Sequence, residues 1–236
     1  MKRTLASTGI TTVAIAIGLA GCGTEPSQQK NAPSNTTSGA ASTTSSTVKK
    51  PQSKVAPRIA PDGPNPSIAS YLRDSKISAT PVHRGDPGAP TINFPIPKDW
   101  ADAGPDTPAT AYWAIVDNGP EAAKYPPSIV ATVSKLEGNV DPQKLIELAA
   151  GTTKNLPGFK QMGDGNEDNL AGSPAYQFGG TWTHDGQERA VADKVVVING
   201  SDHIYLLELN ADCLPDQVME ALPATVAIDE KTTIAD

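Results

Sequence analysis

The sequence predicts an α+β domain in which helices flank a largely antiparallel β-sheet, and three observations support this fold class. Apolar residues alternate in consecutive segments between residues 175 and 210, which is the pattern of β-strands. The dipeptides Asp185-Gly186 and Asn199-Gly200 separate these segments and are typical of tight hairpin turns. Helical segments stand before and after them, so the order is helix, three strands, helix, strands, helix.

The expected helices begin at residues that cap helices well. Ser67 supplies a hydroxyl cap for a short first helix. Asp141 followed by Pro142 supplies a carboxylate cap and a proline at the first helical position. The helices are therefore expected over 67–74, 141–156 and 216–222, with the last one broken at Pro223.

The expected strands are recognised by alternation and by β-branched or aromatic residues. The first is expected at a sheet edge because Pro95 cannot donate a ladder hydrogen bond. The turns at Asp185-Gly186 and Asn199-Gly200 are expected to be two-residue turns with positive φ. The strands are expected over 91–96, 112–116, 129–136, 175–183, 189–198 and 204–210.

The first 21 residues have the three-part order of a signal peptide. Lys2 and Arg3 are followed by an apolar run over 10–20 and by small residues before Cys22. The run is about half of the roughly 20 residues that a membrane-spanning helix needs. The four residues 19–22, Leu-Ala-Gly-Cys, resemble the lipobox of bacterial lipoprotein precursors. That resemblance implies cleavage between Gly21 and Cys22 and a diacylglyceryl group on the Cys22 thiol, which holds the chain to a membrane.

Residues 22–65 are expected to form a disordered tether, and residues 66–236 a globular domain. The tether is rich in Ser, Thr, Asn, Gln and Pro and has too little apolar surface to offset the entropy of ordering. The chain carries a net charge of −7, and residues 66–236 account for −12 because the first 65 residues carry +5. Such an acidic domain repels phosphate backbones, so we expect no nucleic-acid partner. The charge is interpreted as a solvated surface that keeps the domain monomeric, with an acidic binding face as the alternative.

No catalytic, metal or cofactor motif stands out. The chain has no Gly-x-Ser-x-Gly motif and no Cys/His set with zinc spacing. Residues 164–168 begin like a calcium loop, but Asn169 and Ala175 stand where glycine and glutamate are needed. Cys213 has no histidine nearby in sequence, so it is expected to be a small buried side chain. The sequence therefore predicts a protein that is not an enzyme, with no catalytic residue, no metal and no cofactor.

One loop and two aromatic side chains are candidate ligand-binding residues. His83, Arg84 and Asp86 lie in a loop between prolines and could orient a polar ligand, the alternative being an Asp86–Arg84 brace within the loop. Trp113 and Trp182 could stack on a sugar ring, the alternative being that both belong to the core. Because Trp113 follows Tyr112 on a strand, we expect Trp113 to point inward and its neighbour to face the opposite way.

A resemblance to a known family is carried by residues 81–92, 129–136, 155–159, 209–212 and 228–234. These stretches resemble the LpqN/LpqT family of mycobacterial lipoproteins, and the similarity covers all of residues 66–236. The resemblance implies a Mog1/PsbP-like fold and an envelope rich in trehalose mycolates. It also implies links to the mycolate-ester exporter and to enzymes that esterify trehalose, and it supplies no catalytic motif.

These observations predict a lipid-anchored protein on the extracytoplasmic face of the cell envelope. As the family resemblance implies, its expected ligand or partner is a trehalose-based glycolipid or a mycolate-ester export or transfer protein. The alternatives are a surface module that binds other proteins, host proteins included, and an unrecognised hydrolase.

Overall fold

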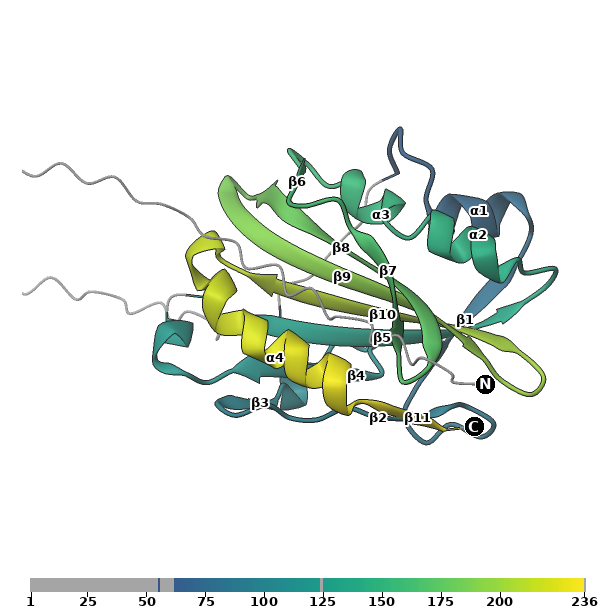
Figure 1. Cartoon of the computed structure of the whole chain (residues 1–236), viewed down its shortest axis with the longest axis horizontal. Helices are drawn as coiled ribbons and strands as arrows, with labels where there is room; N and C mark the ends of the chain where they lie inside the picture. Colours follow the sequence, from purple (N-terminus) through teal and green to yellow (C-terminus); the bar gives the residue numbers. More distant parts are fainter. Residues whose placement is uncertain (1–54, 56–61, 124, 236) are drawn as a thin grey trace, which may run out of the picture. The chain divides into compact units, whose positions relative to one another are not determined.

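The computed structural model describes residue 55 and residues 62–123 and 125–235 (Figure 1). The predicted signal peptide, Gly21, Cys22 and most of the predicted tether lie outside the described residues. None of the helices described is both long enough and apolar enough to span a membrane.

The described part of the chain is built on a nine-stranded sheet in which every pairing is antiparallel. The strand order is β3-β4-β5-β10-β9-β8-β6; β1 also pairs with β5, and β7 with β8. A separate two-stranded sheet joins β2 (Thr91–Asn93) to β11 (Thr233–Ala235). The strands of the large sheet are β1 (Ser78–Val82), β3 (Trp100–Asp102), β4 (Trp113–Asp117), β5 (Ser128–Glu137), β6 (Lys160–Gln161), β7 (Asn166–Leu170), β8 (Ser173–His184), β9 (Gln187–Asn199) and β10 (Ile204–Cys213).

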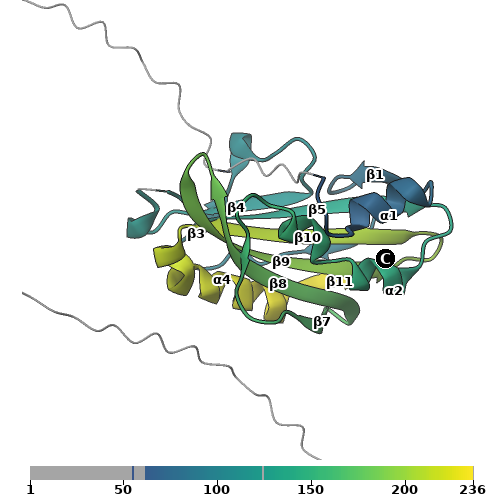
Figure 2. The ribbon, with the colours of Figure 1, turned by 90° about the horizontal axis from the view of Figure 1, so that it is seen from above.

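Helices cover both faces of this sheet (Figures 1 and 2). Alternate residues of β9 show the two faces, because Val196 packs with Ile228 of α4 whereas Val195 packs in the cluster formed with α1 and α2. The helices are α1 (Ile68–Asp74), α2 (Pro142–Glu147), α3 (Gly151–Lys154) and α4 (Val218–Lys231), with 3₁₀ turns η1 (Gly104–Asp106), η2 (Pro120–Ala123) and η3 (Pro215–Gln217). The predicted α+β fold class is confirmed.

Two predicted helix starts are confirmed by their capping hydrogen bonds. The Ser67 hydroxyl accepts from the backbone N–H of Ser70, 3.2 Å away. The Asp141 carboxylate accepts from the N–H groups of Gln143 and Lys144. Local sequence therefore fixes where α1 and α2 begin.

The continuous helix predicted over 141–156 is wrong, because the segment forms α2 and α3 with a break between them. The segment that enters the domain crosses at this break. A Cβ atom at Gly151 would collide with the carbonyl oxygen of Pro66, so only glycine fits there. Gly151, the first residue of α3, thus lies against a residue 85 positions earlier in the chain, and helical periodicity does not predict such a long-range contact.

The final helix and the second hairpin turn also differ from the sequence prediction. The final helix passes through Pro223 and continues to Lys231, with the proline exposed on its outer side. Asp185 and Gly186 form the predicted turn with φ values of 50° and 77°. Asn199-Gly200 forms no such turn, since neither residue has positive φ and a four-residue connection, 200–203, joins β9 to β10.

Contacts also occur N-terminal to the predicted domain boundary at residue 66. Val55 is buried against Ala103, Ala114 and Val116. The backbone N–H of Asn65 donates to the side-chain oxygen of Asn155 at 3.0 Å. Two residues assigned to the tether thus contact the folded domain.

Candidate functional site

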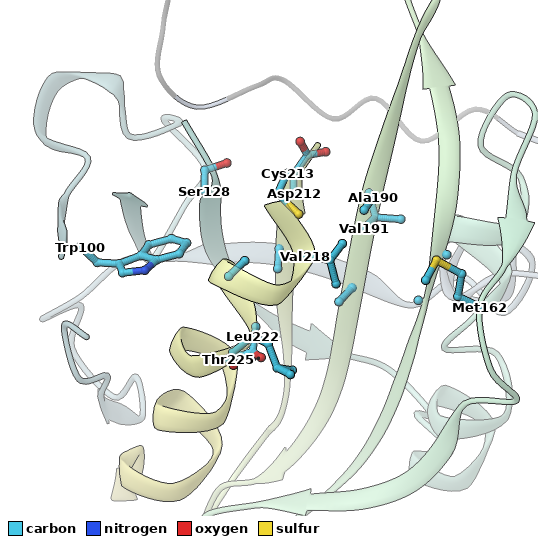
Figure 3. A pocket seen from close by; sticks show the side chains of 15 residues that line it. Trp100, Ser128, Met162, Ala190, Val191, Asp212, Cys213, Val218, Leu222 and Thr225 are labelled. Atoms are coloured by element: carbon cyan, nitrogen blue, oxygen red, sulfur yellow. Dashed lines mark hydrogen bonds between the residues drawn. The ribbon is translucent and has the colours of Figure 1, made fainter. Parts of the chain in front are cut away.

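An apolar pocket of about 180 Å³ lies on the α4 face of the sheet. Figure 3 shows Trp100 and Met162 at opposite sides of it and α4 between them. Its apolar lining is typical of sites that take the hydrocarbon part of a ligand. The lining residues are Trp100, Ser128, Met162, Gly179, Gly180, Ala190, Val191, Ala192, Ala211, Asp212, Cys213, Val218, Ala221, Leu222 and Thr225.

The pocket exists because three neighbouring strands carry small residues at one level. Gly179, Ala192 and Ala211 are cross-strand partners on β8, β9 and β10. Further along the same face the corresponding row contains Val196 and Leu207, which are fully buried in the core. Where the row is glycine and alanine, α4 finds no large side chains to pack on, and the space stays open.

The size of the pocket limits what it can hold. A dry cavity of about 150 Å³ in another protein holds one benzene molecule, and pockets for larger ligands begin near 300 Å³. This pocket therefore suits one apolar group, such as part of a hydrocarbon chain. A complete glycolipid would leave its polar part outside.

Two polar groups in the pocket wall, the Thr225 hydroxyl and the Cys213 thiol, carry no charge at neutral pH. The Thr225 hydroxyl donates to the carbonyl oxygen of Leu222 at 2.9 Å. Burial raises the pKa of the Cys213 thiol to about 12, with the charges of Asp212 and Asp216 adding to the effect. At neutral pH the thiol is protonated, so it behaves as an apolar side chain.

Asp212 contributes to the lining, but its carboxylate points away from α4 (Figure 3). It forms a buried cluster with Arg189 and Tyr125. Asp212 Oδ1 accepts from Arg189 Nε at 3.0 Å and from the Tyr125 hydroxyl at 2.6 Å. Burial, the Asp212 charge and this hydrogen bond raise the pKa of Tyr125 far above its ordinary value. The carboxylate charge is thus compensated outside the pocket.

The loop predicted to bind a polar ligand is braced internally, though not as expected. Asp86 accepts a 2.8 Å hydrogen bond from the backbone N–H of His83 and lies 3.6 Å from its ring, whereas the expected brace was Asp86–Arg84. The Arg84 guanidinium lies over the Tyr112 ring, 5.8 Å from its centre. Ligand binding by His83, Arg84 and Asp86 stays a prediction.

The two tryptophans are core residues. Trp113 is 5% exposed and stacks on Phe94 with the ring centres 4.7 Å apart, so its inward orientation is confirmed. Tyr112 is also buried, so neither residue of the pair is exposed, and its hydroxyl is held between the Ile92 N–H and the Pro90 carbonyl. Trp182 is 2% exposed and packs with Leu156. Neither tryptophan offers a face on which a sugar could stack.

The predicted ligand residues are therefore not brought together, and the pocket was missed. The only local clue was Gly179-Gly180 in the middle of a strand, where glycine often marks close approach of a ligand or another backbone. The rest of the site depends on the alignment of three strands.

Comparisons with known proteins agree with the predicted family. A family model described as probable lipoprotein LpqN matches residues 64–235. Lipoprotein LpqN of Mycobacterium tuberculosis (strain ATCC 25618 / H37Rv) is 47% identical over 172 residues, which is 73% of this chain and 75% of the relative.

One solved structure supports the same family. The crystal structure of LpqN involved in cell envelope biogenesis of Mycobacterium tuberculosis matches with a TM-score of 0.69 and 46% identity, over 74% of this chain and 100% of that one. The Ran-binding protein Mog1p of Saccharomyces cerevisiae matches at 12% identity and a TM-score of 0.43, over 68% and 97%. PsbP (CyanoP) of Synechocystis sp. PCC 6803 matches at 10% and 0.41, over 66% and 92%; neither of these two supports a functional argument. With the family model matched over 64–235, the chain belongs to the LpqN lipoprotein family.

Proposed function

We propose that this chain is a lipid-anchored lipoprotein of the cell envelope that is not an enzyme and binds the hydrocarbon part of an envelope lipid in the pocket beside α4. The observation that carries the proposal is the row of small residues, Gly179, Ala192 and Ala211, which leaves an apolar pocket beside α4. Each buried methylene of a bound chain contributes about 0.8 kcal/mol. A short length of chain in the pocket would thus hold the lipid reversibly.

The family supports the setting of this function. The crystallised LpqN of Mycobacterium tuberculosis is involved in cell envelope biogenesis, and this chain shares 46% identity with it. We assign the same setting here, with lipid on Cys22 holding the protein at the extracytoplasmic face of the membrane. The lipid handled is a trehalose mycolate type of glycolipid, and the partners are proteins of mycolate-ester export or transfer.

The chemistry of the most obvious nucleophile supports a binding role. Cys213 is buried with its thiol pKa raised, so it lacks the thiolate that cysteine catalysis requires. His184 also has a structural role, because it flanks the β8–β9 turn and lies 3.5 Å from the Asp185 carboxylate. We therefore propose that the pocket binds a ligand without changing it.

A titration tests the proposal. The secreted chain carrying Cys22→Ser, which cannot be lipidated, is titrated with a trehalose monoester by calorimetry and by methyl chemical shifts. We expect binding that shifts the methyl signals of Ala190 and Ala211, whereas trehalose without its acyl chain leaves them unmoved.

Matched variants locate the binding. Ala192 is an exposed residue on the pocket floor, so Ala192→Leu fills the pocket without disturbing the core and should weaken binding at least tenfold. Ala79→Leu makes the same change on the exposed edge strand β1 and should bind like the unaltered chain. No heat and no shift change at millimolar ester would overturn the glycolipid assignment. Equal binding by both variants would exclude the pocket.

A further inference from the structure

The solvent-facing side of α4 carries three large exposed apolar side chains. The inner face buries Ala221, Ala224 and Ile228 against the sheet. Met219, Leu222 and Val226 are 71%, 48% and 44% exposed. They are spaced three and four residues apart, which puts them on one face of the helix. We call these three residues the α4 outer stripe.

The apolar surface continues across the pocket. Met162, in the segment after β6, is 49% exposed and lines the side of the pocket away from Trp100 (Figure 3). Leu222 belongs both to the pocket wall and to the stripe. Exposed apolar groups gathered around a pocket mark an interaction surface, and methionine adapts its shape to different partners.

The charges beside the stripe indicate what covers it. Asp216, Glu220 and Glu230 are exposed on η3 and α4, and Lys231 is the exposed basic residue of this segment. Residues 66–236 carry a net charge of −12, as the sequence shows. Helices that lie on anionic membranes are rich in Lys and Arg, and two copies of this acidic surface repel each other. Charge complementarity therefore favours a basic partner over a bilayer or a second copy.

We propose that the α4 outer stripe, together with Met162, is a docking surface for a basic amphipathic segment of another protein. Apolar side chains of that segment cover Met219, Leu222 and Val226, and its Lys or Arg residues meet Glu220 and the neighbouring carboxylates. This is the mode in which amphipathic helices bind grooves with adaptable apolar surfaces. The site goes beyond lipid binding, because Met219 and Val226 do not line the pocket.

A peptide pair provides the test. The secreted Cys22→Ser chain is titrated by fluorescence anisotropy with a labelled helical peptide of leucine and lysine, and with a matched peptide of leucine and glutamate. We expect the lysine peptide to bind at least tenfold more tightly, with affinity that falls as salt is added. Equal affinity for the two peptides would overturn the proposal.

Variants separate this surface from the rest of the molecule. Met219→Ser should weaken binding of the lysine peptide at least fivefold. Glu220→Lys should also weaken this binding and reduce its dependence on salt. Ile96→Ser is the control, because Ile96 is an equally apolar residue, 54% exposed, outside the stripe. If Met219→Ser and Ile96→Ser bind alike, the stripe is not the docking surface.

Two further measurements decide between occupants and between proposals. Sedimentation equilibrium tests whether the chain forms a concentration-dependent dimer, and co-flotation with phosphatidylcholine vesicles tests whether it binds a bilayer. If Met219→Ser abolishes such a dimer or such co-flotation, the stripe is covered by a second copy or by a bilayer, and the proposal is overturned. Met219→Ser should leave trehalose monoester binding unchanged. The docking surface and the pocket can thus fail independently.

Discussion

Cys213 shows how its surroundings decide the chemistry of a single side chain. It ends β10 and packs with Ala190 of β9 and Ala221 of α4. The sequence predicts a small buried side chain there, and the structure confirms it. Because burial raises the pKa of the thiol to about 12, the thiolate fraction at pH 8 is on the order of 10⁻⁴.

Alkylation tests this environment. In the folded Cys22→Ser chain, iodoacetamide should modify Cys213 about a thousandfold more slowly at pH 8 than it does in guanidinium chloride, where an ordinary thiol is partly ionised. Mass spectrometry of the alkylated chain gives both rates. Similar rates in the two conditions would show that the thiol is neither buried nor protonated as described.

Lys194 is a second residue whose role the sequence did not reveal. Its side chain is nearly buried, and its ammonium lies 2.7 Å from Asp168 of β7 and 2.7 Å from Asp229 of α4. One buried cation thus ties an edge strand and the last helix to the centre of the sheet.

The pKa values of these two carboxyls move in opposite directions. Burial raises the pKa of Asp168, but the Lys194 hydrogen bond, the Asn169 N–H and the Lys194 charge outweigh it, and the net pKa is lowered. For Asp229, burial raises the pKa by more than Lys194 lowers it, so the net pKa is raised. The contribution of the Lys194 ion pairs to the free energy of unfolding therefore depends on pH.

At the scale of elements, α4 is held by its apolar inner face and by Asp229, and acid should affect the second contact. The native pKa of Asp229 lies above its unfolded value, so the folded state takes up the proton first as pH falls, and stability rises relative to Asp229→Asn. The native pKa of Asp168 lies below its unfolded value, so stability is lost relative to Asp168→Asn over the same fall. Urea unfolding at pH 7 and about pH 4 compares the variants. Shifts of the same sign in both comparisons would contradict the assignment.

The elements also show which parts of the fold local sequence can predict. The caps at Ser67 and Asp141 and the turn at Asp185-Gly186 were predicted, because each depends on neighbours within a few residues. Five strands were not predicted: β1, β3, β6, β7 and β11. They are two to five residues long and mostly exposed, so no alternation marks them.

At the scale of the whole molecule, the proposed anchor decides where the domain works. A diacylglyceryl group on the Cys22 thiol would hold two hydrocarbon chains in the bilayer, and two chains give stable attachment where one is marginal. Cys22→Ser should move most of the protein from the membrane fraction to the soluble fraction. Immunoblots of fractionated cells measure the distribution.

Cys213→Ser is the matched control, because it changes the other cysteine of the chain, which is buried in the pocket wall. That variant should remain with the membrane. Membrane association of Cys22→Ser equal to that of the unaltered chain would show that the attachment lies elsewhere.

The sequence by itself determined the fold class, the principal strands and helix starts, and the family. Those features depend on local spacing, capping groups and recognisable stretches of residues. Only the tertiary structure decided that a pocket forms and where it lies. Gly179, Ala192 and Ala211 form one row because the registers of β8, β9 and β10 align them, and residues of α4 form another wall of the pocket. A pocket left by missing side chains depends on long-range register, and local sequence patterns do not encode register across three strands.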